Sequence, residues 1–551
     1  MESQRSLFIL VFAFVSFLVW QQWQTDYGPK PVQTTAAAAS AAPNAAGSND
    51  VQLSASGTTQ TEPAAPATNT SKQISVSTDV FDIVIDTKGG NIVGLDLPKF
   101  TVSLDDKTPH QMMRQVEGYA YTAHSGLLGD GPDEKGKEGL VYTTTADSFK
   151  LVEGQSELIV SLTGEYQGLQ IEKRFTFQAG KYDVRVEYLV KNISNGSKVV
   201  QPYTYLAQTI DAGKAGNMMM PIYRGGAYST QEERYTKFTF DEMKEESLAK
   251  STQGGWVGML EHYFVSAWVP AQNEQNQLFT KVVNGNLAVI GSQGQQVSIA
   301  AGETKSIGAV FYAGPKDQDS LKQLAKGLDL TVDYGVLWWI SQPLFWALEL
   351  IHGFIGNWGL AIIGITLLVK GLMFPLTKAQ YESMAKMRNL KPKLDEIQAR
   401  YKDDRQKLSQ AMMELYRKEK VNPMGGCLPL LIQMPIFLAL YWVFVESVEL
   451  RQAPFMLWIH DLSAQDPFFV LPVLYMLSMY AMQKLTPVTV TDPMQQKIML
   501  WMPVVFGVFF MWFPSGLVLY WVVSNLISLA QMLYIYKQME KKGLHVPTKK
   551  A

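Results

Sequence analysis

Five long apolar segments lie in the C-terminal part of this chain of 551 residues. A helix needs roughly 20 apolar residues to cross the hydrocarbon of a bilayer, so these segments are typical of membrane spans. The expected spans are 357–375, 427–447, 467–484, 498–513 and 516–536. A sixth apolar segment, within residues 1–24, follows Arg5 and ends in the aromatic pair Trp20 and Trp23. The sequence therefore predicts a polytopic α-helical membrane protein with six transmembrane helices.

Residues 1–24 allow two interpretations. A cleaved signal peptide has this charge and length, whereas an uncleaved signal anchor would explain the aromatic pair at the membrane interface. No cleavage site of small residues follows directly, and the first alanine cluster begins at Ala36. The anchor is therefore favoured, and both interpretations export the residues that follow.

The exported part has two regions of different composition. Residues 25–73 are rich in Ala, Thr, Ser, Pro and Gln, so they predict a flexible linker. Residues 74–330 contain many short runs in which apolar and polar side chains alternate, bounded by Gly, Asn and Asp. This alternation predicts antiparallel strands and an all-β sandwich domain in the periplasm, inserted between the first two spans. The lone cysteine, Cys427, lies outside this domain and excludes an internal disulfide.

The exported domain shows no sign of catalytic chemistry. It contains no nucleophile motif and no cluster of metal ligands. Its scattered histidines are expected at the surface or half-buried rather than as ligands: His110, His124 and His262. The spans contain no HExxH motif. We therefore expect no enzyme activity, no metal and no cofactor.

Residues 335–356 are apolar but contain Pro343, Glu349 and several tryptophans. Because Trp prefers the headgroup region, this segment predicts an amphipathic helix in the membrane surface rather than a span. Charge supports this interpretation. The segment 376–423 holds 12 Lys and Arg against 7 Asp and Glu, and a crossing at 335–356 would place it outside, against the positive-inside rule.

The same rule orients the rest of the chain. The connection 448–466 is acidic and is expected outside, while the tail 537–551 is basic and is expected in the cytoplasm with the N-terminus. Within 376–423, apolar residues recur at helical spacing in two runs, which predicts a cytoplasmic hairpin of two helices. These residues are Leu390, Leu394, Ile397 and Tyr401, then Leu408, Met412 and Leu415.

Lys370 lies inside the span 357–375. A charge in the hydrocarbon costs about 2.5–3.5 kcal/mol on insertion scales. Two explanations stay open from the residues alone. The lysine either extends its stem to the nearby cytoplasmic surface, or it faces a hydrated cavity and acts on a substrate.

Several motifs, in this order along the chain, resemble those of the bacterial YidC insertases of the YidC/Oxa/Alb family. They lie at 375–387, 421–437, 455–462, 491–497 and 513–520. The similarity is dense over 335–545. The additional N-terminal anchor and the exported β domain resemble the Gram-negative form of the family.

The resemblance implies a hydrophilic groove that opens to the cytoplasm and sideways to lipid. Lys370 stands where the bacterial proteins usually carry an arginine, which retains the charge without the guanidinium fork. Thr366 matches a groove-lining threonine. Tyr520 matches a tyrosine that contacts substrate, and Trp521 stands where a second tyrosine is common. The apolar positions that match the substrate path are Met434, Phe437 and Phe509.

The function implied by the resemblance is insertion and folding of inner-membrane proteins, alone or with the Sec translocon. The implied partners are nascent membrane proteins, Sec components, membrane lipids, and the ribosome through the cytoplasmic loops and basic tail. DNA is not among them. The implied location is the bacterial inner membrane. Two spans look short, with 16 residues each in 468–483 and 498–513, and we expect local bilayer thinning beside them.

Two other functions remain as alternatives. A small-molecule transporter would usually show inverted repeats and several intramembrane charges, and the sequence shows neither. A membrane-anchored periplasmic assembly factor would act through 74–330 and use its helices only as an anchor. Deletion of most of that domain would distinguish it from an insertase.

Overall fold

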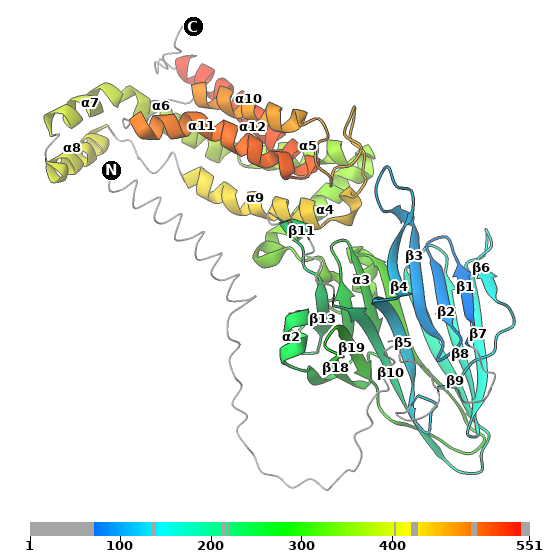
Figure 1. Cartoon of the computed structure of the whole chain (residues 1–551). Helices are drawn as coiled ribbons and strands as arrows, with labels where there is room; N and C mark the ends of the chain where they lie inside the picture. Colours follow the sequence, from blue (N-terminus) through cyan, green and yellow to red (C-terminus); the bar gives the residue numbers. More distant parts are fainter. Residues whose placement is uncertain are drawn as a thin grey trace, which may run out of the picture. The chain divides into compact units, whose positions relative to one another are not determined.

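The structure, a computed structural model, describes residues 71–133, 139–210, 216–217, 220–401, 404–419, 428–485 and 493–541. The expected anchor at 1–24, the linker up to residue 70 and the tail beyond residue 541 lie outside the described residues. The chain divides after Val332 into a β-rich unit and a helical unit (Figure 1).

The β-rich unit contains two large sheets. The larger has 11 strands. In spatial order they are β15 (Ala249–Gln253), β18 (Gln275–Val283), β19 (Leu287–Gln293), β10 (Lys198–Thr209), β5 (Tyr119–Gly129), β4 (Pro109–Val116), β3 (Asn91–Thr101), β2 (Asp82–Asp86), β1 (Gln73–Ser77) and β6 (Ser148–Lys150), with β20 (Val297–Ile299) paired to β10. The pairs are antiparallel except β1 with β6, which is parallel.

The smaller sheet has eight antiparallel strands. Their order is β14 (Thr236–Phe238), β13 (Gly225–Ser229), β16 (Trp256–Leu260), β17 (Phe264–Val269), β21 (Thr304–Pro315), β9 (Asp183–Asn192), β8 (Leu169–Gln178) and β7 (Glu157–Tyr166). Short elements complete the unit: β11 (Gly216–Asn217), β12 (Met220–Pro221), α2 (Phe240–Glu245), α3 (Gln318–Leu324) and the 3-10 turn η1 (Asp329–Thr331).

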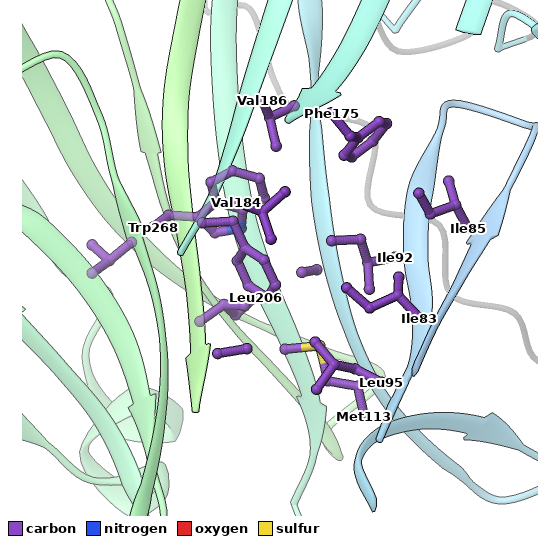
Figure 2. Packing of buried hydrophobic residues seen from close by; sticks show 14 of the residues in the cluster. Ile83, Ile85, Ile92, Leu95, Met113, Phe175, Val184, Val186, Leu206 and Trp268 are labelled. Atoms are coloured by element: carbon purple, nitrogen blue, oxygen red, sulfur yellow. The ribbon is translucent and has the colours of Figure 1, made fainter. Parts of the chain in front are cut away.

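One apolar core joins the two large sheets, which confirms the expected β-sandwich (Figure 2). Side chains of the larger sheet, such as Ile83, Leu95 and Leu206, meet Phe175 and Trp268 of the smaller sheet. The core follows from the alternation, because successive residues of a strand point to opposite faces.

A lysine occupies a core position of the sandwich. Lys173 lies between Ile171 and Phe175 on the buried face of β8 and is 0% exposed. Its Nζ donates hydrogen bonds to the carbonyl oxygens of Gly89 and Ser125, each at 3.0 Å. The amine therefore ties the smaller sheet to two parts of the larger one.

The helical unit contains nine described helices of ten residues or more. They are α4 (Trp338–Ile355), α5 (Trp358–Leu372), α6 (Phe374–Asn389), α7 (Lys391–Arg400), α8 (Arg405–Lys418), α9 (Leu428–Glu446), α10 (Val470–Leu485), α11 (Pro493–Phe509) and α12 (Ser515–Lys541). The 3-10 turns are η2 (Gly335–Leu337), η4 (Val448–Leu450) and η5 (Phe510–Trp512).

The helix bounds differ in detail from the expected spans. Helices α5 and α6 meet at Met373 and are bent by 62°. Helix α11 begins at Pro493, before the apolar run expected at 498–513. Helix α10 has 16 residues and begins at Val470, inside the span expected at 467–484. Among the described helices, α12 alone is long and apolar enough to cross a membrane. If α5 and α6 together count as one bent span, the number of such spans rises to two. The number of six spans therefore stays a prediction.

The segment 376–423 contains most of α6 as well as α7 and α8, and the last two carry the two apolar runs. Lys393 of α7 forms an ion pair of 2.6 Å with Glu419, which directly follows α8. Helix α6 packs on the C-terminal half of α12 through Tyr381, Ala385 and Met532. Whether this hairpin lies in the cytoplasm stays a prediction.

Candidate functional site

Lys370 lies on the buried face of α5. It is 7% exposed and shares this face with Ile362 and Val369, whereas Leu367 and Leu372 on the other face are exposed. The helix begins at the Asn357 cap, whose side-chain oxygen accepts a hydrogen bond from the Leu360 amide. The lysine stem is therefore directed into the helical unit and away from its outer surface.

The amine of Lys370 contacts α12. Its Nζ donates to Ser528 Oγ at 2.8 Å, and Gln531 Nε2 donates to the Lys370 carbonyl at 3.1 Å. In the part of the chain that the structure describes, no carboxylate forms an ion pair with this amine. A buried charge held by a neutral hydroxyl keeps most of its electrostatic attraction for an incoming anion.

Thr366 lies one turn before Lys370 on the same face and is 0% exposed. Its hydroxyl donates to the carbonyl of Ile362 in the same helix, at 2.6 Å. This is the usual arrangement for a helical threonine in an apolar environment, because it satisfies the hydroxyl locally.

Three of the expected residues form an aromatic cluster between α9 and α12. The ring of Phe437 stacks on Trp521 at 5.5 Å and lies 6.3 Å from Tyr520. Both α12 residues are buried, and Trp521 also contacts Phe510 at 3.8 Å. The indole Nε1 of Trp521 is buried without a hydrogen-bond partner in the described structure, so it could donate to a polar group that enters here.

The other two expected residues are more peripheral. Met434 is half-buried on α9, and Phe509 on α11 is 38% exposed, with its ring 5.0 Å from Phe513. The structure therefore places the Lys370 amine at Ser528 of α12 and the aromatic cluster at Tyr520 and Trp521. Ser528 and Tyr520 are eight positions apart, which is about 12 Å along a helix axis.

Sequence reasoning missed the polar face of α12. Ser524, Ser528 and Gln531 follow the spacing i, i+4, i+7 and so share one side of the helix. A second polar contact joins α12 to α10, where Asn525 Nδ2 donates to Ser478 Oγ at 3.1 Å. The signal was present in the sequence, as polar residues at helical spacing within the apolar run 516–536.

The connection 448–466 contacts the N-terminal ends of α10 and α12. The carboxylate of Asp466 is 2% exposed and accepts hydrogen bonds from the Trp458 indole at 2.9 Å and from the Leu471 amide at 2.7 Å. The first amides of α12, in Ser515 and Gly516, donate to carbonyls of this connection. These contacts fix the N-termini of α10 and α12 together.

The β-rich unit contains a separate cavity of about 280 Å³, lined by Trp268, Tyr188 and several hydroxyl residues. The hydroxyls bond to one another: Ser125 with Tyr188 at 3.0 Å and Thr204 with Ser292 at 2.9 Å. These four hydroxyls are thus satisfied without a ligand. Among the residues that the structure describes, no group of His, Cys, Asp and Glu could hold a metal ion.

Two family models match this chain. Residues 350–542 match the 60Kd inner membrane protein family, and residues 73–347 match the YidC periplasmic domain. The chain is 51% identical to the membrane protein insertase YidC of Shewanella baltica, over 99% of this chain and 100% of that protein.

The membrane protein insertase YidC of Mannheimia succiniciproducens is 50% identical, over 99% of both chains. A crystal structure of an active YidC insertase with its first transmembrane domain resolved matches at a TM-score of 0.38, with 21% identity over 84% of this chain and 92% of that one.

Proposed function

This chain belongs to the YidC family and is a membrane protein insertase of the inner membrane rather than an enzyme, and we propose that nascent proteins enter it beside Lys370. The proposed site is a hydrophilic groove that opens to the cytoplasm and to lipid. Its walls are α5, α9 and α12.

Electrostatics explain why such a groove helps. Moving a charged side chain through ~30 Å of hydrocarbon is the main barrier to insertion. A hydrated groove that reaches partway shortens this path, and the Lys370 ammonium attracts acidic groups of the incoming segment. The observation that carries this proposal is the contact of the amine with Ser528, a neutral partner, on the buried face of α5.

The apolar wall receives the arriving helix. Phe437, Tyr520 and Trp521 form an aromatic cluster between α9 and α12, in which the two α12 rings are buried. The more exposed Phe437, Met434 and Phe509 provide the apolar surface around this cluster. We expect such a surface to accept many sequences, because aromatic and Met side chains bind apolar segments without fixed polar partners.

The position of the helices in the membrane is part of the proposal. Helix α4 exposes a broad apolar face with Trp339, Trp346, Leu350 and Phe354, which supports a place in the membrane surface. The basic segment 376–423 and the tail then lie in the cytoplasm with both termini, where they can contact the ribosome. Cooperation with the Sec translocon belongs to the same proposal.

The short helix α10, with 16 residues, measures about 24 Å. We expect the bilayer to thin beside it and to lower the barrier further. Adding four leucines to α10 and to the apolar part of α11 should then slow insertion in vesicles. Insertion at an unchanged rate would remove thinning from the mechanism.

The test of the groove uses two clients, meaning nascent membrane proteins, that differ only in an acidic or a neutral translocated tail. Lys370→Ala should lose insertion of the acidic-tailed client, and Lys370→Arg should retain it. Crosslinks from positions 370 and 520 to a stalled client should locate the path. Full insertion of the acidic-tailed client by Lys370→Ala would refute the electrostatic role.

The competing assembly-factor function places the activity in the β-rich unit. Deletion of 74–325 distinguishes the two, because an insertase should still insert both clients. A transporter would instead move a small solute in vesicles without any nascent chain, with Lys370 as its ionisable group.

A further inference from the structure

The contacts of Lys370 have a feature that the groove alone does not require. Its ammonium rests on α12, on a residue 158 positions away in the chain. A charge so buried needs a polar partner, and Ser528 is the side chain within hydrogen-bond distance. Without it, the flexible stem would extend toward the nearest water.

The backbone at Lys370 is also fixed from α12. The last four carbonyls of a helix have no partner within that helix, and Lys370 lies in the last turn of α5, just before the bend at Met373. Gln531 Nε2 donates to this carbonyl at 3.1 Å. Gln531 thus supplies a hydrogen-bond donor to a backbone carbonyl at the end of α5.

The same glutamine offers a further acceptor. Its Oε1 is buried and has no hydrogen-bond partner in the described part of the chain. Ser528 and Gln531 are three positions apart and face α5 together. The amine therefore lies beside one hydroxyl that it uses, and the glutamine three positions further along α12 carries an amide oxygen that is unoccupied.

We propose that Ser528 and Gln531 are positioning residues that hold the Lys370 ammonium inside the groove until a carboxylate of a client replaces the Ser528 hydroxyl. The inference rests on the groove function proposed above. Exchange is favourable because a carboxylate adds the Coulomb attraction of an opposite charge to the hydrogen bond, which the neutral hydroxyl does not supply. A permanent acidic partner on α12 would instead block exchange.

In the test, the full chain in vesicles inserts the acidic-tailed and the neutral-tailed client. Insertion is measured as protection of the client from protease. Ser528→Ala should lower the ratio of acidic to neutral insertion about fivefold or more, because a hydrogen bond to a charged group is lost. Ser528→Thr, which retains the hydroxyl, should stay within about twofold of the parent ratio. Ser528→Asp should lower the ratio to that of Lys370→Ala.

Ser524→Ala is the matched control, one turn away on the same face of α12, and should leave the ratio unchanged. If Lys370→Ala lowers the ratio but Ser528→Ala leaves it unchanged, the positioning role is overturned. An equal loss of both clients in Ser528→Ala would overturn it as well. If Lys370→Ala itself leaves the ratio unchanged, the groove proposal fails and the positioning role fails with it.

Discussion

Replacement of Lys173 by methionine tests how a charged group is accommodated in the β-sandwich core. Burial lowers the pKa of this amine from 10.5 to about 7, and the nearby Asp133 carboxylate opposes the shift. Between these two values the unfolded chain binds a proton that the folded chain does not. Stability should therefore rise with pH across this window, by up to about 1.4 kcal/mol per pH unit.

Lys173→Met removes this dependence. The difference in unfolding free energy between the parent and the variant should increase in favour of the parent as the pH rises from 6 to 9.5. The variant lacks the amine whose deprotonation gives this slope, and it also removes the cation that lowers the pKa of the buried Asp133 carboxyl. The variant also leaves the carbonyls of Gly89 and Ser125 without their donor, which adds a pH-independent cost of about 1–3 kcal/mol for each.

Urea unfolding of residues 72–332 at pH 6 to 9.5 provides the assay, since this unit has its own core. Its two tryptophans, Trp256 and Trp268, are both buried and report unfolding by fluorescence. Lys191→Met, on the outward face of β9, is the control and should not change the slope. A parent-minus-variant difference that stays constant from pH 6 to 9.5 would refute the assignment of a neutral buried amine.

Three further predictions concern the helical unit, the first two measured in detergent and the third in vesicles. Gly359→Ala should lower the melting temperature of the unit, because the added Cβ would lie 2.0 Å from the Phe455 ring. Gly371→Ala on the same helix meets open space and should be neutral or stabilising. Equal effects of the two substitutions would contradict the packing at Gly359. Asp466→Ala should destabilise the unit by about 2–5 kcal/mol, because several buried N–H groups lose their acceptor; unchanged thermal unfolding would argue against this network. Trp521→Phe should retain insertion of an apolar client, since the ring stacking is kept, and a large loss would show that the indole N–H is required.

Much of the architecture could be predicted from local patterns. The alternation in 169–177 predicts both strand β8 and its buried face, because a strand turns successive side chains to opposite sides. Apolar runs likewise predict the helices of the C-terminal half. Their ends were less certain: α11 begins at Pro493 and α5 ends at a bend, since these bounds depend on packing against neighbouring helices.

The sequence by itself determined that Lys370 is a charge within an apolar helix and that residues 74–330 form a sandwich, because hydrophobicity and its period are local properties. Only the tertiary structure decided what surrounds that charge. The register between α5 and α12 brings Ser528 and Gln531 to Lys370, and the pairing of the two sheets brings Gly89 and Ser125 to Lys173. Both depend on contacts between residues far apart in the chain, which no local pattern encodes.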